Sequence, residues 1–217
     1  IDTHMTIVGA RIHQELLGIQ TYSFLESPQP QKSLTVSRSF GHPIQEFDEL
    51  KEAICFFTGR AGEKLRRQNL WVREMGITLM SKERGENGFL TFGAMGKFHE
   101  PTNLTKQLIQ MAASLMTKAF KPGISYRKAG VHFYDFYGPH QRQLDIFNSS
   151  PNFDMDSIHI SNQTEIITQG AVDHLNKKFG RNSIFYGAQG LENTWSHETS
   201  KRSPRWTTRW SELPVVL

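Results

Sequence analysis

Hydrophobic residues recur along this chain in two different periods, and these periods predict its secondary structure. A period of three to four residues indicates a helix with one buried face, and a period of two indicates a strand with one buried face. The pattern predicts helices at residues 5–17, 48–69, 104–119 and 164–179, and strands at residues 33–39, 71–80, 89–98, 126–136 and 183–186. Between residues 33 and 136 the predicted order is therefore strand, helix, strand, strand, helix, strand.

This βαββαβ order predicts an α+β domain of the ferredoxin-like type. Such a domain places both helices on one face of the sheet and leaves the other face open to a ligand. The sequence Gly85-Glu86-Asn87-Gly88 favours a tight hairpin turn between the second and third strands. We therefore expect function on the open sheet face.

Changes in composition divide the chain into four segments. Residues 1–27 hold the first helix, and two prolines at residues 28 and 30 make the following stretch a linker. Residues 28–140 hold the βαββαβ pattern. From residue 139 to residue 156 the composition turns to Pro, Asn, Ser and Asp, and residues 141–156 are expected to be a tether. Residues 157–217, with one helix and one short strand, predict a small α/β extension.

The composition narrows the classes of protein. With 37% hydrophobic and 11% aromatic residues the chain can build a packed core, and a net charge of +4 permits nucleic-acid binding without requiring it. The single cysteine, Cys55, cannot close an intramolecular disulfide, and no apolar run or targeting segment is evident, so we expect a cytoplasmic protein. No catalytic or metal-binding motif has its full spacing, so we expect no catalytic residue, metal or cofactor in this chain.

Basic residues gather at three places. Between residues 60 and 73 five cations face one acid, Glu63. Two interpretations remain open there: a solvated helix face whose arginines pair with Glu63, or a surface that binds phosphates. On the first predicted strand a row of Ser and Thr hydroxyls, continued by Arg38, suits phosphate oxygens, and Arg127 and Lys128 flank the last strand similarly.

Four segments together resemble the UmuC-type, Y-family translesion DNA polymerases. They are Ser37-Arg38-Ser39-Phe40-Gly41, Arg60-Ala61-Gly62-Glu63-Lys64-Leu65-Arg66, Lys128-Ala129-Gly130-Val131 and Thr207-Thr208-Arg209-Trp210-Ser211. The resemblance runs over nearly the whole chain. It implies the end of a thumb region at residues 1–27, a little-finger domain at residues 28–140 and a C-terminal extension at residues 157–217.

The resemblance also implies a function. In that family the carboxylates that hold Mg²⁺ lie in a palm region, which would precede these residues, so this chain is expected to be a non-catalytic part of a DNA-directed DNA polymerase. The parent enzyme would act in DNA repair and SOS mutagenesis. Ser37, Arg38, Ser39, Arg127 and Lys128 match positions with which the family holds the backbone of damaged DNA, without sequence preference.

The predicted tether contains the pentapeptide Gln143-Leu144-Asp145-Ile146-Phe147. It resembles the motif that binds the bacterial β sliding clamp, in which a glutamine forms a hydrogen bond at the rim of a cleft and apolar side chains fill it. The alternative is that the apolar side chains pack back onto their own domain. We favour the clamp because every motif position holds a fitting residue type.

Trp195, Trp206 and Trp210 bring three of the four tryptophans into the extension. We expect a structural role for at least two of them. The resemblance implies that the extension serves the UmuD' dimer and the RecA filament, on a surface built from residues 164–179 and the Trp-rich tail. Deletion of residues 157–217 is then expected to leave DNA and clamp binding unchanged.

Two other classes share the βαββαβ order. An RNA-recognition module stacks bases on aromatics two residues apart, whereas Phe89 and Phe92 are three apart and are expected on opposite faces. A ferredoxin-like protein-interaction domain would account for the tether but would leave the hydroxyl-rich strand unexplained.

Overall fold

The first of two compact units in the chain is a single helix. The computed structural model describes residues 6–21, 31–85, 88–138, 155–192, 194–196 and 203–213, with the backbone alone for residues 155–163. Contacts divide the chain into Ile1–Gln31 and Lys32–Leu217. In the first unit α1 (Ile7–Leu16) confirms the predicted helix. It ends in a Schellman motif, because Gly18 has a φ of 80° and Ile19 N–H donates to the Gln14 carbonyl at 2.9 Å.

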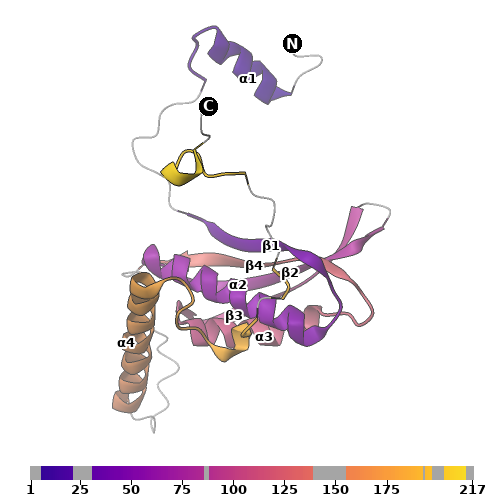
Figure 1. The fold of residues 1–217 in the computed structure, drawn as a ribbon. Helices are drawn as coiled ribbons and strands as arrows, with labels where there is room; N and C mark the ends of the chain where they lie inside the picture. The colour runs from indigo at the N-terminus through magenta and orange to yellow at the C-terminus, as the bar shows by residue number, and fades with distance from the viewer. Residues whose placement is uncertain are drawn as a thin grey trace. The chain divides into compact units, whose positions relative to one another are not determined.

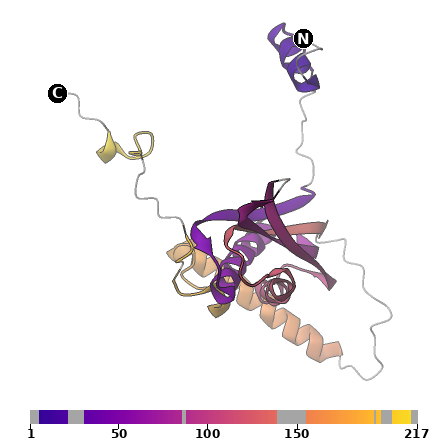
Figure 2. The same cartoon turned by 90° about the vertical axis from the view of Figure 1, so that its right-hand side faces the viewer.

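The second unit is built on an antiparallel sheet that two helices cover on one face (Figures 1 and 2). The elements are β1 (Ser33–Ile44), α2 (Phe47–Arg67), β2 (Trp71–Gly85), β3 (Gly88–Thr102), α3 (Thr105–Ala119) and β4 (Tyr126–Tyr137). The predicted α+β class and βαββαβ order are confirmed. The strand order β1-β4-β2-β3 puts β4 between β1 and β2, antiparallel to both, and leaves β1 and β3 at the edges.

The core lies between the sheet and the two helices. On β4 the predicted alternation holds: Ala129, Val131 and Phe133 are buried, and the residues between them point to the other face. The helices supply the opposite side of the core with Leu50, Ile54, Phe57, Leu65, Leu108, Leu115 and Met116. Complete burial of such a side chain stabilises the fold by about 1.5–3 kcal/mol. This packing fixes which face of the sheet stays uncovered.

The predicted hairpin between β2 and β3 is confirmed. Gly85 and Gly88 are paired at its end, and Gly88 has a φ of 115°, which a residue with a side chain rarely adopts. The two residues between them lie outside the described part of the chain. The turn joins the two longest strands of the sheet.

The extension begins with α4 (Met155–Phe179), which confirms the predicted helix and starts earlier than predicted. The predicted strand at residues 183–186 is wrong. There Asn176 binds both backbone groups of Ile184, each at 2.9 Å, and these bonds hold the chain in a turn. Two short 3-10 segments, η2 (Gly187–Gln189) and η3 (Trp210–Glu212), follow, so the described part of the extension contains no strand.

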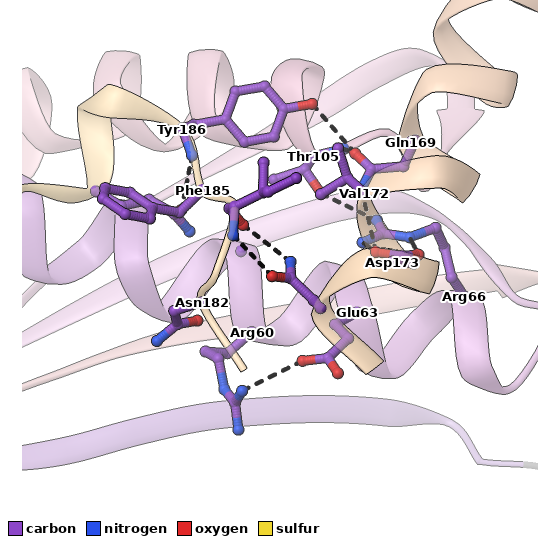
Figure 3. Close-up of a pocket in the computed structure, with 14 residues that line it drawn as sticks. Arg60, Glu63, Arg66, Thr105, Gln169, Val172, Asp173, Asn182, Phe185 and Tyr186 are labelled. Atoms are coloured by element: carbon purple, nitrogen blue, oxygen red, sulfur yellow. Dashed lines mark hydrogen bonds and ion pairs between the residues drawn. The ribbon is translucent and has the colours of Figure 1, made fainter. Parts of the chain in front are cut away.

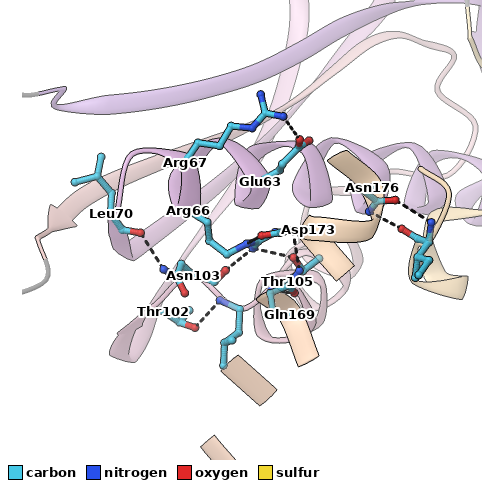
Figure 4. Close-up of polar contacts among 12 residues, drawn as sticks. Glu63, Arg66, Arg67, Leu70, Thr102, Asn103, Thr105, Gln169, Asp173 and Asn176 are labelled. Atoms are coloured by element: carbon cyan, nitrogen blue, oxygen red, sulfur yellow. Dashed lines mark hydrogen bonds and ion pairs between the residues drawn. The ribbon is translucent and has the colours of Figure 1, made fainter. Parts of the chain in front are cut away.

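One arginine of α2 fixes α4 to the sheet domain. Arg66 donates to both carboxylate oxygens of Asp173 on α4, at 2.5 and 2.9 Å (Figure 4). One of its nitrogens also donates to the Asn103 carbonyl at 2.6 Å and to the Thr105 hydroxyl at 3.0 Å. A bidentate, charge-assisted pair of this kind constrains orientation as well as distance. The extension is therefore packed on α2 and α3.

The tail of the extension completes the core. Trp195 is only 3% exposed, and its ring lies edge-on to those of Phe40, Phe56 and Phe57, with centroids 6.3, 5.2 and 5.1 Å away. Its carbonyl accepts a hydrogen bond of 3.1 Å from Gly41 N–H on β1. Residues from the far end of the chain thus close the core beside β1 and α2.

The expectations for the tryptophans and for deletion of the extension need correction. Of the three tryptophans only Trp195 is part of the core, whereas Trp206 is 54% and Trp210 is 90% exposed. The expectation that deletion of residues 157–217 leaves DNA and clamp binding unchanged assumed that the extension is structurally separate. The burial of Trp195 contradicts that assumption, since deletion would expose the phenylalanines around it to water.

The described residues hold few groups suited to covalent or metal chemistry. Cys55 is a free thiol buried on α2, and burial raises its pKa to about 11, so it is protonated and unreactive at neutral pH. Within the described ranges no three His, Cys, Asp or Glu side chains come together as metal ligands. Helices that combine the length and apolar character needed to cross a bilayer are also absent from the described part of the chain.

We predict that Trp195→Ala lowers the free energy of unfolding by about 3–5 kcal/mol, because it removes a large buried side chain and leaves a cavity among three phenylalanines. Denaturant titration of the full chain measures this. The matched control Trp210→Ala, at an exposed position, should change stability by less than about 0.5 kcal/mol. Equal effects of the two substitutions would contradict the assignment of Trp195 to the core.

Candidate nucleic-acid interface

The face of the sheet opposite the helices carries four transverse rows of side chains, each with one residue from every strand. The pairing of β1 with β4, of β4 with β2 and of β2 with β3 places the members of each row next to one another. In the order β1, β4, β2, β3 the rows are Ser33, Tyr134, Glu74, Lys97; Thr35, His132, Gly76, Met95; Ser37, Gly130, Thr78, Gly93; and Ser39, Lys128, Met80, Thr91.

The third row, which includes Ser37, consists only of short residues. A Cβ atom at Gly130 would lie 2.7 Å from the Cβ of Ser37, and one at Gly93 would lie 2.9 Å from the carbonyl oxygen of Ile77. Larger residues cannot occupy these two positions without displacing the neighbouring strand. Glycines inside strands commonly mark a close approach of another backbone or a ligand. Because this row has no large side chain, the backbone in the middle of the uncovered face is accessible and is lined with hydroxyls.

His132 bridges three strands in the second row. One ring nitrogen lies 3.1 Å from the Thr35 hydroxyl on β1 and the other 2.9 Å from the Thr78 hydroxyl on β2, and the ring stacks on Tyr134 at an interplanar angle of 10°. Burial of the ring, helped by the positive charge of Lys128, lowers the pKa of His132 below its usual 6.5. The imidazole is therefore neutral at neutral pH and organises the hydroxyls around it.

A β-bulge in β4 brings two basic residues together at one end of this face. Met80 pairs with Lys128 while the next residue of β2, Ser81, pairs with Tyr126, so Arg127 is an extra residue in β4. The bulge sends Tyr126 into the core although Lys128, two residues later, is on the uncovered face. Arg127 and Lys128 consequently lie side by side at one end of the sheet.

Phe89 holds Arg127 in place. The Arg127 guanidinium lies 4.3 Å above the Phe89 ring and that of Arg84 lies 5.0 Å from it, which are cation–π contacts. Phe92 packs against the core. The prediction that Phe89 and Phe92 lie on opposite faces is therefore confirmed, and the aromatic pair of an RNA-recognition module is not formed by these residues.

Arg38 does not belong to the uncovered face. It pairs with the buried Ala129 and shares the side of β1 with the buried Leu34, whereas Ser37 and Ser39 point the opposite way. The interpretation that Arg38 continues the hydroxyl row is thus wrong, because strand alternation sends its side chain to the helix side of the edge. The structure brings the other four predicted DNA-binding residues together on the uncovered face.

The arginines of α2 divide between two roles. Arg60 and Arg67 both pair with Glu63, at 3.3 and 2.5 Å, as the helical-spacing interpretation predicts. Arg66 instead binds Asp173 on α4 (Figure 4), a contact that could not be inferred from local spacing. One carboxylate thus serves two guanidiniums on the outer side of α2.

A small cleft lies where α2 and α4 meet the turn at residues 181–189 (Figure 3). Its polar groups bind one another: the Tyr186 hydroxyl donates to Gln169 at 3.2 Å, and the Gln169 amide donates to Asp173 at 3.2 Å. Burial raises the pKa of Tyr186, so its hydroxyl stays protonated. We interpret this cleft as part of the polar interface between the extension and the sheet domain.

The predicted clamp-binding peptide, Gln143-Leu144-Asp145-Ile146-Phe147, lies outside the described residues. Its contacts therefore stay a prediction from the sequence.

Known protein families match two parts of the chain. Residues 31–146, just over half of its length, match the impB/mucB/samB family C-terminal domain. Residues 169–216 match a domain of unknown function, DUF4113. The first match covers the whole sheet domain, and the second covers most of the described extension.

Curated relatives are similar over the whole chain. Protein MucB of Salmonella typhimurium is 28% identical over 212 residues, which are 97% of this chain and 48% of the relative. Protein UmuC of Salmonella typhimurium strain LT2 is 27% identical over 214 residues, which are 98% of this chain and 49% of the relative. The chain thus spans about half the length of these relatives.

Among solved structures, the chain is similar to the little finger domain of PolIV in a complex with the β-clamp processivity factor. The identity is 18%, the TM-score is 0.39, and the match covers 52% of this chain and 97% of that one. A similarity of this size is too low to support an argument about this chain.

We predict that part of the stability is lost as the pH falls below about 6.5, the pKa of an unfolded histidine. Because folding lowers the pKa of His132, the unfolded chain binds the proton more readily in the window between the two pKa values, and acid favours unfolding there. Denaturant titrations at pH 7.5 and 5.5 should show a smaller pH effect in His132→Gln than in the wild type. An identical pH effect in both proteins would contradict the neutral, bridging imidazole.

Proposed function

Because the chain belongs to the impB/mucB/samB family and contains the C-terminal domain of that family, we propose that it is the DNA-gripping part of an error-prone translesion DNA polymerase. The observation that carries this proposal is the uncovered sheet face, where a row of hydroxyls and glycines lies beside Arg127 and Lys128. Those groups suit the sugar-phosphate backbone of damaged DNA.

The chemistry of this face favours backbone contacts over base contacts. Short Ser and Thr hydroxyls donate to phosphate oxygens, and a guanidinium and an ammonium at one end add charge. Asn and Gln side chains, which read adenine by bidentate hydrogen bonds, are absent from the four described rows, and Arg127 lies at the end of this face. Binding of this kind has little sequence preference, which suits a polymerase that must hold altered templates.

The proposal assigns polymerisation to the parent protein and not to this chain. These residues span about half of the similar proteins MucB and UmuC. We propose that Mg²⁺ and its carboxylate ligands belong to the other half, as does nucleotide transfer in SOS mutagenesis and DNA repair. A bacterial enzyme that acts on chromosomal DNA would work in the cytoplasm.

The alternative of an RNA-recognition module is less well supported. Base stacking on a sheet needs free aromatic faces. The guanidinium of Arg127 covers one face of Phe89, and the Tyr134 ring lies parallel to that of His132 with the centroids 6.3 Å apart. Phe89 therefore cannot stack a base without rearrangement of its contact with Arg127.

We expect the chain to bind duplex DNA of any sequence, and Arg127→Ala with Lys128→Ala to weaken that binding equally for all sequences. The slope of log affinity against log salt should become shallower by about 1 for each phosphate contact that is removed, hence by about 2. Fluorescence anisotropy at several salt concentrations measures this. The control Lys118→Ala removes one charge from an exposed position on α3 and should have no such effect. Equal affinities of the wild type and the double variant would refute the assignment of this face.

We also propose that residues 143–147 tether the parent polymerase to the β sliding clamp. The support is the sequence pattern: Gln143 suits the orienting hydrogen bonds, and Leu144 and Phe147 suit buried anchors.

Leu144→Ala with Phe147→Ala should abolish capture of the clamp in a pull-down, because the double variant removes the apolar groups that fill the cleft. DNA binding should not change. The control Ser149→Ala with Ser150→Ala lies in the same segment and should leave capture intact. Clamp capture by the Leu144/Phe147 variant at wild-type strength would contradict the proposal.

We further propose that the extension binds the UmuD' dimer and the RecA filament. The exposed rings of Trp206 and Trp210 support this assignment, since large exposed aromatics are typical anchors at protein interfaces. Trp195, which is part of the core, cannot contribute to that surface.

A further inference from the structure

Four arginines gather on the helix side of β1, from three separate parts of the chain. We call this cluster the arginine edge. It consists of Arg38 on β1, Arg60 and Arg67 on α2, and Arg181 just after α4.

Strand alternation places Arg38 in this cluster. Its neighbours Ser37 and Ser39 point to the uncovered face, and Arg38 points to the side that α2 covers. Its side chain is nevertheless exposed, because β1 is the edge strand and has no neighbour beyond it. Arg38 therefore lies between the open sheet face and the outer side of α2.

Helical spacing places Arg60 and Arg67 on one face of α2, with Glu63 between them. Glu63 accepts from both guanidiniums (Figure 4 shows its contact with Arg67) and neutralises one of the two charges. In Figure 3, Arg60 lies beside Asn182 at the end of the cleft remote from Tyr186. The pair remains net positive.

The turn after α4 brings the fourth arginine to the same place. Gly180 and Asn182 both have positive φ angles, 110° and 65°, and Asn176 fixes the turn through Ile184. Arg181 lies between them and is exposed. The extension thus adds a cation to a surface that otherwise belongs to the sheet domain.

The other three arginines of the edge all act electrostatically on Arg60. Burial lowers the pKa of Arg60, Glu63 raises it, and the positive charges of Arg181, Arg38 and Arg67 lower it further. Four guanidiniums against one carboxylate leave a net charge of +3. Within the described part of the chain, the side chains of Arg38 and Arg181 form neither a hydrogen bond nor an ion pair.

We propose that the arginine edge binds phosphate groups of a nucleic-acid backbone that continues from the open sheet face across β1. Guanidinium groups bind phosphates in a bidentate manner and stay charged at every physiological pH. A polyanion also relieves the repulsion among four like charges. The proposal rests on the proposed DNA binding by the open face, and it adds the extension, through Arg181, to the DNA-binding surface.

Continuity favours a nucleic acid over an acidic peptide as the ligand. Arg38 is flanked along β1 by Ser37 and Ser39, which are among the proposed backbone contacts of the open face. A nucleic-acid strand that runs from the open face across β1 beside these serines would reach Arg38 first. It would then reach the other three arginines. A peptide would have no such path from the hydroxyl row.

The test compares the full chain of the wild type with Arg38→Gln, Arg181→Gln and the charge-matched control Lys118→Gln. Affinity for a duplex is measured at several salt concentrations. Each arginine variant should lower the salt slope by about 1 and the control should leave it unchanged. Thermal unfolding followed by circular dichroism should be the same for all four proteins, because the substituted side chains are exposed.

Three results would overturn the proposal in distinguishable ways. If Arg127→Ala with Lys128→Ala weakens binding while Arg38→Gln and Arg181→Gln leave affinity and slope unchanged, the arginine edge is not a DNA contact and the proposed function stands. If the wild type fails to bind DNA, both the DNA contact of the arginine edge and the proposed DNA binding by the open face are refuted. If a polyglutamate peptide binds the wild type but not the arginine variants, while DNA binding is unaffected, the surface serves an acidic protein.

Discussion

The packing of α2 and α3 against only one face of the sheet determines the rest of this structure. Each strand must send every second side chain into that core. The side chains on the other face do not pack in the core, so they can be small or polar. Three glycines and a set of hydroxyls occupy the middle of the free face, where Gly76, Gly93 and Gly130 come from three different strands. The core thus leaves a surface that a polyanion can approach closely.

The extension is a structural part of the sheet domain as well as a candidate binding module. Arg66 fixes α4 against α2, and Trp195 fills the core beside β1. Two different interactions, one charged and one apolar, hold separate parts of the extension to the same domain. These contacts also hold together a surface that combines Arg38 of the sheet domain with Arg181 of the extension.

Periodicity predicted the elements well because the pattern of buried residues is local. The helices and strands of the sheet domain begin and end within a few residues of their predicted bounds, apart from β1 and β2, which extend five residues further. Contacts between distant residues could not be predicted in this way. Glu63 was the natural partner of Arg66 by spacing, yet Asp173, far along the chain, binds it.

The candidate site shows the same limit. Strand alternation predicts that Ser37, Ser39 and Lys128 lie on the uncovered face. The same rule, applied to Arg38, would have placed its side chain on the opposite face. The bulge at Arg127 left no recognisable signal in the sequence, because one extra residue in a ladder depends on the pairing with β2. Asn176 likewise overrode the β-branched, aromatic character of residues 183–186 with side-chain bonds to the backbone.

The position of Trp195 has a consequence for synthesis on the ribosome. All four strands and both covering helices leave the ribosome before this residue does, since β4 ends at Tyr137. Because synthesis adds roughly 5 to roughly 20 residues per second, several seconds separate the completed sheet domain from the arrival of Trp195. Phe40, Phe56 and Phe57 are incompletely covered during that interval. The nascent domain then presents an aromatic surface to chaperones, and only the arrival of the C-terminal segment closes it.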